Sequence, residues 1–292
     1  MSGRADGGFD SVFPAPAKIN RFLHITARRT DGYHELQTVF QFLGLADRLR
    51  FEPLPAGRYE MAGTAIDGSD NLCLRAARSL AAATGRAFGV RIHLDKRIPI
   101  GGGLGGGSSD AATTLVALNH LYELGCTVDR LAALGLELGA DVPVFVAGHA
   151  AWAEGVGERL VPVDPEQGWV LLIDPGVRVA TGAMFGAAEL TRDCPTETIS
   201  SEFDAGRFGN VFEPVVRARY PEVDRALTWL ASETPCACLS GSGGCVFGMF
   251  PDQAAAHRAQ SRQPEAWASW VTPLLNVSPL QVWLPAAAAS GA

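Results

Sequence analysis

The stretch Pro99-Ile-Gly-Gly-Gly-Leu-Gly-Gly-Gly-Ser-Ser-Asp110 contains six glycines within the seven residues 101–107. Consecutive glycines let backbone N–H groups point into one concavity, and a following helix adds unpaired N–H donors and the positive end of its dipole. We therefore expect an anion, most simply a phosphate group, to bind at this stretch.

The residues on either side predict an ordered loop between a strand and a helix, and not a flexible linker of low complexity. Residues 90–98 alternate apolar and polar side chains, as a half-buried strand does. Residues 109–124 repeat apolar positions at helical spacing, and Ser108 and Ser109 are good N-cap residues at its start. The pattern predicts a strand, a glycine loop and a capped helix.

Two common nucleotide-binding motifs do not describe this loop. A Walker loop ends in Gly-Lys-Ser/Thr, whereas Gly107 is followed directly by Ser108. The glycines fit G-x-G-x-x-G, but a dinucleotide-binding fold needs a second β-branched strand after the helix, and residues 129–139 have a helical pattern. The loop is predicted to hold phosphate by a third design.

The composition is that of an ordinary globular protein, and 292 residues suffice for two domains. The formal net charge of −7 argues against a nucleic-acid surface, because such surfaces are usually basic. No apolar run approaches the roughly 18 residues that span a bilayer, so we expect a cytoplasmic protein without membrane partners. The six cysteines lack zinc-ligand spacing and are expected to be buried, reduced thiols.

Lysine is rare in this chain, since the 24 basic residues comprise 22 arginines and two lysines, Lys18 and Lys96. A lysine that persists against this bias suggests a need for a compact charge, which the planar guanidinium cannot supply. Lys18 is therefore a candidate functional residue, and strand alternation places it with Asn20 and Phe22, opposite Leu23. Lys96, at the end of a strand, is expected to be solvated.

Several other positions combine polar chemistry with a turn or an element boundary. Tyr33 and His34 leave a polar turn, and a functional and a structural role are equally compatible with that place. Asp141 stands between a helix and an apolar segment, where it could cap the next helix, act in a site, or both. A domain boundary is expected near residues 162–169, and residues 239–245 are expected to form a tight turn.

Three segments together resemble the GHMP kinases, a superfamily of small-molecule kinases. They are Ala15-Pro-Ala-Lys-Ile-Asn20, the glycine loop 99–109, and Leu239-Ser-Gly-Ser-Gly-Gly-Cys245. Residues 29–41, 139–145 and 148–157 are similar to one branch, which phosphorylates 4-diphosphocytidyl-2-C-methyl-D-erythritol in the non-mevalonate route to isoprenoid precursors. The resemblance covers most of residues 14–282.

The resemblance implies an α+β fold with the active cleft between two domains. These would be a ribosomal-protein-S5-like domain of residues 14–165 and a ferredoxin-like domain of residues 166–284. It also implies ATP and Mg²⁺ as cofactors, the 2-hydroxyl of a substrate carrying a cytidine diphosphate group as the acceptor, and a monomer or weak homodimer. Gly244 stands where alanine is more usual in the family, which bears on the contact made by that loop.

The same resemblance assigns the catalytic and ATP-binding residues. Lys18 and Asp141 would be the catalytic pair, with Asp141 as the base and Lys18 stabilising both that carboxylate and the acceptor oxygen. No acidic metal ligand is assigned, which leaves Ser109 as a candidate metal ligand. The ATP phosphates would be wrapped by Pro99, Ile100, Gly101, Gly102, Gly103, Leu104, Gly105, Gly106, Gly107, Ser108 and Ser109.

The substrate residues follow from the branch. Asn20 would lie beside the erythritol portion, Tyr33 and Phe185 would flank the cytosine ring, His34 would hydrogen-bond to its edge, and Thr181 would line the pocket. Two alternatives remain open at this point: a GHMP kinase for another small alcohol, and a sensor on the same fold without catalysis. An aromatic sandwich suits cytosine, and a sensor has no need of both Lys18 and Asp141.

Overall fold

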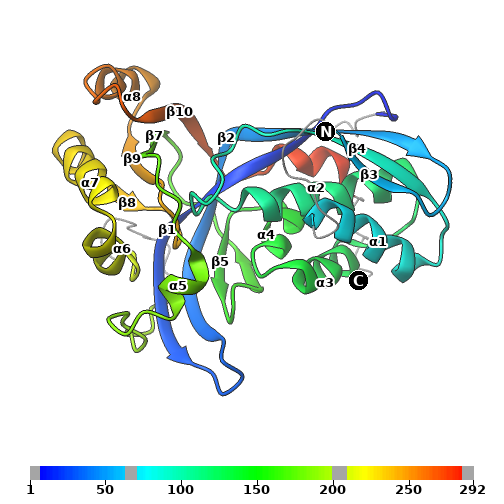
Figure 1. The fold of residues 1–292 in the computed structure, drawn as a ribbon, viewed down its shortest axis with the longest axis horizontal. Coiled ribbons are helices and arrows are strands. Elements are labelled where there is room, and N and C mark those ends of the chain that lie inside the picture. Colours follow the sequence, from blue (N-terminus) through cyan, green and yellow to red (C-terminus); the bar gives the residue numbers. More distant parts are fainter. Residues whose placement is uncertain (1–6, 63–70, 199–208, 285–292) are drawn as a thin grey trace.

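The computed structural model describes residues 7–62, 71–198 and 209–284, which fold around long β-strands with helices at both ends (Figure 1). The strands are β1 (Phe13–Arg28), β2 (His34–Leu54), β3 (Tyr59–Ala62), β4 (Gly89–Asp95), β5 (Ala151–Glu154), β6 (Arg159–Pro162), β7 (Trp169–Asp174), β8 (Ala237–Leu239), β9 (Val246–Phe250) and β10 (Ala268–Leu275). The helices are α1 (Leu72–Thr84), α2 (Gly106–Leu121), α3 (Val128–Leu138), α4 (Val142–Ala147), α5 (Thr181–Phe185), α6 (Glu213–Arg219), α7 (Pro221–Glu233), α8 (Gln253–Gln260) and the 3₁₀ helix η2 (Pro279–Trp283).

The sheet is mostly antiparallel, in the order β3-β4-β2-β10-β7-β9-β8, and only β3 and β4 pair in parallel among the described strands. The long strand β2 is its organising element, because it pairs with β1, β4, β5 and β10. This topology is incompatible with the parallel sheet of a dinucleotide-binding fold. It agrees with the predicted α+β class.

Two hydrophobic cores lie at opposite ends of the sheet, and β1 contributes to both. Helices α1–α4 cover one end and α6–α8 lie at the other (Figure 1), with Phe13 buried in the first core and Leu23 and Ile25 in the second. A smaller third cluster joins them and contains Leu104, the one large side chain within the glycine run, which is 1% exposed. Burial of Leu104 anchors the loop to the junction.

Two local predictions are wrong. Helix α2 begins at Gly106 with Gly105 as its N-cap, so Ser108 and Ser109 lie inside the helix. The left-handed conformation of Gly105 starts the helix early, because glycine adopts it without strain. The alternation of β1 also breaks at an irregularity between Asn20 and Leu23, which brings Leu23, and not Phe22, to the same cavity as Lys18.

The division into residues 14–165 and 166–284 stays a prediction. At its boundary, the carbonyl oxygen of Glu166 accepts hydrogen bonds from Arg21 Nη1 (3.1 Å) and Gln41 Nε2 (3.2 Å). The helix η2, which follows β10, packs on the first core. The ring centroids of Trp283 and Phe13 are 4.5 Å apart. The end of the predicted second domain therefore packs with the first.

Within the described residues, no helix is both long and apolar enough to cross a membrane. All six cysteines are free thiols, as predicted, but only Cys73 and Cys245 are buried, so the prediction of burial is wrong for the other four.

Candidate active site

The glycine loop between β4 and α2 has the backbone of an anion cradle. Gly101, Gly103 and Gly105 have φ of +78°, +78° and +69°, in alternation with residues that are not left-handed. Alternating right- and left-handed residues direct successive N–H groups into one concavity. The first helical hydrogen bond of α2 runs from Ser109 N–H to the carbonyl of Gly105 (2.8 Å), so the preceding N–H groups of the helix have no helical acceptor.

The turn between β8 and β9 packs directly on this cradle. Ser240 donates from Oγ to the carbonyl of Gly103 (3.1 Å), and Cys245 N–H donates to the carbonyl of Gly102 (3.2 Å). A Cβ atom on Gly103 or on Gly243 would overlap the backbone of the other loop. The predicted tight turn is thus also a support for the glycine loop, which its own sequence did not indicate.

A cavity of about 630 Å³ runs along the loop. Besides the loop, its lining includes Asn71, Leu72, Leu94, Lys96, Lys18, Asp141 and Phe185. The predicted site residues that line it are Lys18, Asn20, Pro99, Ile100, Gly101, Gly102, Gly103, Leu104, Gly105, Gly106, Gly107, Ser108, Asp141, Thr181 and Phe185. Its lining does not include Ser109, Tyr33 or His34.

A chain of buried hydrogen bonds orients Lys18, whose side chain is 4% exposed. Its ammonium donates to Asn20 Oδ1 (2.7 Å) and to the carbonyl of Gly103 (3.0 Å). Asn20 Nδ2 donates to Thr38 Oγ1 (2.9 Å), and Thr38 donates to the carbonyl of Phe22 (2.5 Å). Thr38 was missed by the sequence analysis, because only the pairing of β1 with β2 brings it beside Asn20.

Asp141 is the partner that remains accessible at this end. Its Oδ2 lies 3.4 Å from Lys18 Nζ, and its side chain is 33% exposed. Asp141 occupies the N-cap position of α4, but its side chain makes no capping hydrogen bond. The carboxylate can therefore face a ligand and Lys18 at the same time. Of the two roles that the sequence left open for Asp141, capping α4 and acting in a site, the capping hydrogen bond is not made.

The prediction that Lys96 is solvated is wrong. Its ammonium lies 2.5 Å from Asp47 Oδ2 and 2.7 Å from Asp110 Oδ2, and its side chain is 15% exposed. Asp47 Oδ1 also accepts from the N–H groups of Arg97 (2.5 Å) and Ile98 (2.8 Å). Burial raises the pKa of the Asp110 carboxyl to about 7, against the opposing effect of Lys96. The buried cluster ties β2, the start of the loop and α2 together.

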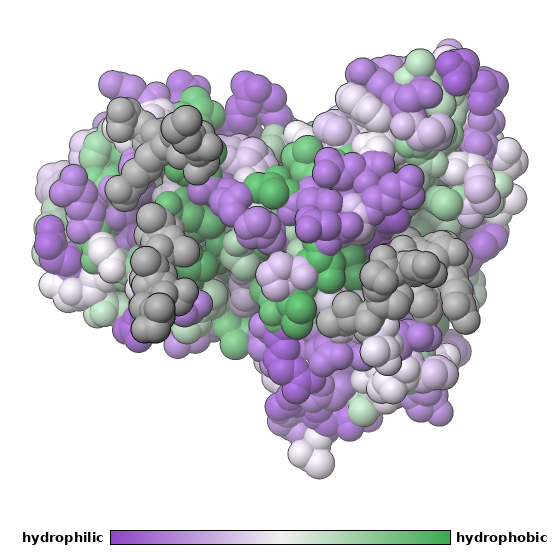
Figure 2. Space-filling view, turned by 180° about the vertical axis from the view of Figure 1, so that it is seen from behind, coloured by the Kyte–Doolittle hydropathy of each residue, from purple (hydrophilic) through white to green (hydrophobic). Residues whose placement is uncertain are grey.

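Of the predicted substrate residues, Asn20, Thr181 and Phe185 line the cavity, and His34 lies beside Phe185. Thr181 Oγ1 accepts from Ser242 Oγ (3.2 Å), and the rings of Phe185 and His34 are 5.2 Å apart at 34°. Tyr33, beside His34 in the hairpin turn, is 63% exposed. The hairpin tip is strongly hydrophilic, with a hydrophobic area directly above it in the view of Figure 2.

Two neighbouring oxygens bear on the magnesium expectation. Among the described residues no group of three His, Cys, Asp or Glu side chains could hold a metal. Ser109 Oγ and Asp110 Oδ1 are, however, buried without a hydrogen-bond partner. Magnesium bound with a nucleotide takes one or two protein oxygens and completes its shell with phosphate and water. These two oxygens have the chemistry that such an ion requires.

Comparison with known proteins agrees with this geometry. The chain matches the family models described as GHMP kinases N terminal domain, over residues 71–149, and GHMP kinases C terminal, over residues 198–269. It is 53% identical over 286 residues to the 4-diphosphocytidyl-2-C-methyl-D-erythritol kinase of Halorhodospira halophila (strain DSM 244 / SL1), covering 96% of this chain and 99% of that protein. The enzyme of the same name from Marinobacter nauticus (strain ATCC 700491 / DSM 11845 / VT8) is 50% identical, with 92% and 96% covered.

The chain belongs to the 4-diphosphocytidyl-2-C-methyl-D-erythritol kinases. A crystal structure of 4-(cytidine 5'-diphospho)-2C-methyl-D-erythritol kinase has a TM-score of 0.80 at 37% identity, covering 90% of this chain and 99% of that one. A mevalonate kinase structure, at 14% identity and a TM-score of 0.66, shares the fold. The predicted GHMP kinase fold and the prediction of a small-molecule kinase are confirmed, and membership of these kinases supports ATP as the cofactor.

Proposed function

We propose that this chain transfers the γ-phosphoryl group of ATP to the 2-hydroxyl of 4-diphosphocytidyl-2-C-methyl-D-erythritol, giving the 2-phosphate and ADP. The observation that carries the proposal is the placement of the Lys18–Asp141 pair beside the glycine cradle in one cavity. Phosphoryl transfer needs mainly positioning and charge stabilisation, and an accessible carboxylate near a cradle provides both for an acceptor hydroxyl.

The catalytic roles follow from the contacts. Lys18 uses two of its three N–H groups on Asn20 and Gly103, so the third is available to Asp141 and to the acceptor oxygen. Asp141 accepts the hydroxyl proton as the general base. Asn20 keeps Lys18 in place in addition to lining the cavity near the acceptor.

The cavity also orients the nucleotide. The N–H groups of the loop would hold the triphosphate. Lys18 would face its γ-phosphate, and Asn71, Leu72 and Leu94, which also line the cavity, would lie near its base. Thr181 and Phe185 also line the cavity and would contact the substrate, with His34 beside Phe185. Donor and acceptor would thus meet in one cavity.

Magnesium would supply positive charge to the phosphates when it is bound with ATP. Asp110 would hold it, because it lines the cavity and has a buried oxygen without a partner, whereas Ser109 has such an oxygen but does not line the cavity. The protein's own contribution is to fix the loop against the turn between β8 and β9 and to keep Lys18 oriented.

Purified protein assayed for ATP-dependent phosphorylation of four alcohols tests the proposal. The acceptors are 4-diphosphocytidyl-2-C-methyl-D-erythritol, homoserine, mevalonate and galactose. We expect kcat/KM for the first to exceed the other three by a factor of at least about 10³, since each lacks the cytidine diphosphate group. Preference for any of the others would refute the proposed substrate, and no transfer to any would refute the kinase.

A further inference from the structure

Arg192 forms hydrogen bonds with both His34 and the backbone of Phe185, the residues whose rings belong to the proposed cytosine site. Its Nε donates to Nε2 of His34 (3.3 Å), and its Nη2 donates to the carbonyls of Phe185 (2.9 Å) and Ala187 (2.7 Å). Nη1 donates to the carbonyl of Leu190 (2.9 Å). A single guanidinium therefore fixes both the imidazole and the backbone that carries the phenylalanine.

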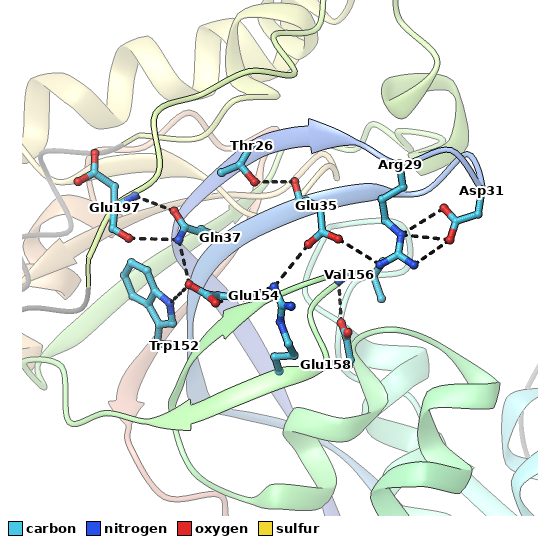
Figure 3. Close-up of polar contacts among 11 residues, drawn as sticks. Thr26, Arg29, Asp31, Glu35, Gln37, Trp152, Glu154, Val156, Glu158 and Glu197 are labelled. Atoms are coloured by element: carbon cyan, nitrogen blue, oxygen red, sulfur yellow. Dashed lines mark hydrogen bonds and ion pairs between the residues drawn. The ribbon is translucent and has the colours of Figure 1, made fainter.

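The segment that carries Arg192 is attached to the β1–β2 hairpin at independent points. Cys194 N–H donates to the carbonyl of Ile25 (2.9 Å). Gln37 accepts from Glu197 N–H (2.8 Å) and donates to the Glu197 carbonyl (3.1 Å), a two-point contact shown in Figure 3. These anchors set the position of Arg192 without help from a bound ligand.

The charged groups around His34 are cationic. Arg192 faces it from this segment, and Arg28 faces it from the end of β1. The carboxylate of the neighbouring Glu35 is engaged instead by Arg29 (3.1 Å, Figure 3) and by Arg159 (3.5 Å). Burial first, and then the two arginines, lower the pKa of His34, so the ring is neutral near pH 7.

A neutral imidazole carries one N–H, and its position follows from the hydrogen bond at the other nitrogen. The Arg192 guanidinium can only donate, so His34 Nε2 accepts and the proton is on Nδ1. We propose that Arg192 is a specificity-determining positioning residue, which holds His34 as the Nδ1–H tautomer so that the ring offers the substrate base a donor and no acceptor.

This inference rests on the proposed function, because it concerns the base of the cytidine diphosphate group. Cytosine presents adjacent acceptors at N3 and O2, whereas uracil carries a hydrogen at N3. A fixed donor pairs with the first base, and against the second it leaves two donors facing each other, which is costly in a desolvated site. Arg192 therefore contributes to the selection of cytosine over uracil through His34.

Nitrogen NMR of the ligand-free enzyme with ¹⁵N-labelled histidine tests the tautomer directly. His34 is assigned by the signal that disappears in His34→Gln. We expect Nδ1–H in the wild type, and a shift toward Nε2–H, the form that free histidine prefers, in Arg192→Met. An Nε2–H tautomer in the wild type would overturn the inference, even if that enzyme phosphorylates the cytidine substrate.

Kinetics of Arg192→Met test the consequence for specificity. At about pH 8 we expect KM for the cytidine substrate to rise about tenfold and kcat to change less than about twofold, as for one lost hydrogen bond. Preference over the uridine analogue should fall about tenfold. Near pH 6 the increase in KM should shrink, because the pKa of His34 moves back toward about 6.5 and the imidazolium again carries Nδ1–H.

Two further variants separate this effect from a structural one. Arg219→Met removes another arginine that contacts the same segment, through Glu189 (2.8 Å), and should leave KM and its pH dependence unchanged. In a His34→Gln background, Arg192→Met should add no pH dependence. A KM increase of equal size at every pH would mean that Arg192 only supports the backbone, and would overturn the inference. Failure of the proposed function is distinct, because the wild type would then show no transfer to the cytidine substrate.

Discussion

The two lysines of this chain line the same cavity but have opposite surroundings. Lys18 is buried and lies beside one carboxylate, that of Asp141, whose side chain is one-third exposed. Lys96 lies between Asp47 and Asp110, which are both buried. The first ammonium has an N–H and an accessible partner to offer a ligand, whereas the second is committed to protein carboxylates. The two lysines therefore lie in different kinds of site. The site of Lys18 suits chemistry, and the site of Lys96 stabilises the structure.

The largest effect is expected from the partner at the first site. Asp141→Asn should lower kcat by about 10²- to 10⁴-fold, because the amide cannot accept the hydroxyl proton. Steady-state kinetics measure the loss, and calorimetry with a non-hydrolysable ATP analogue should show little change in affinity. Asp129→Asn, in the exposed first turn of α3, is the matched control. Near-normal turnover of Asp141→Asn would remove its assignment as the base.

Lys18→Arg should lower kcat by about 10² or more, a loss comparable to that of an oxyanion-stabilising donor. The wider guanidinium keeps the charge but does not fit between Asn20 and the Gly103 carbonyl. Rapid-quench measurement of a single turnover separates this loss from product release. Full activity would show that the site needs only a positive charge and not the compact charge of a lysine.

At the second site, Lys96→Met should lower the free energy of unfolding by about 3–5 kcal/mol, because it leaves buried carboxylates without their cation. Urea denaturation followed by fluorescence measures this loss. Arg97→Met is the control, since its ion pair with Asp95 is exposed and should contribute within about 0.5 kcal/mol. If Lys96→Met were as stable as Arg97→Met, the contrast between the two lysine sites would not hold.

A smaller effect is expected where the two loops meet. Gly244→Ala should destabilise the fold by about 1–3 kcal/mol, because its Cβ would overlap the carbonyl oxygen of Val177. Thermal unfolding measures it against Gly182→Ala, where a Cβ meets nothing within 4 Å. The alanine expected from the resemblance thus does not fit this backbone unchanged. An unchanged unfolding temperature of Gly244→Ala would show that the backbone at Val177 moves to accommodate the added Cβ.

Local patterns predicted the elements better than the contacts between them. The strand, loop and helix around residues 90–124 follow from alternation and helical spacing, whereas the helix start was misplaced because a left-handed glycine replaced a serine cap. The burial of Lys96 depends on Asp47 and Asp110, which approach it only through the register of β2 on β4 and the packing of α2. One signal was present: Asp47 interrupts the apolar pattern of residues 43–49.

The candidate site divides in the same way. The glycine loop could be recognised from its residues, and the pairing of Lys18 with Asp141 came from the resemblance. Thr38 and Arg192 were not predicted. Thr38 contacts the predicted residue Asn20 and Arg192 contacts the predicted residue His34, and both partners are distant in the sequence. Supporting residues of this kind have no pattern of their own in the chain, since their neighbours are determined by the tertiary fold.

The contact of Trp283 with Phe13 has a consequence for folding of the chain during its synthesis on the ribosome. The Trp283 ring packs on the first core, so that core is incomplete until residue 283 has been synthesised. Residues of the other core, from β7 to β10, are synthesised in the interval. Part of the first core therefore stays exposed on the nascent chain until Trp283 has left the ribosome and can pack on Phe13.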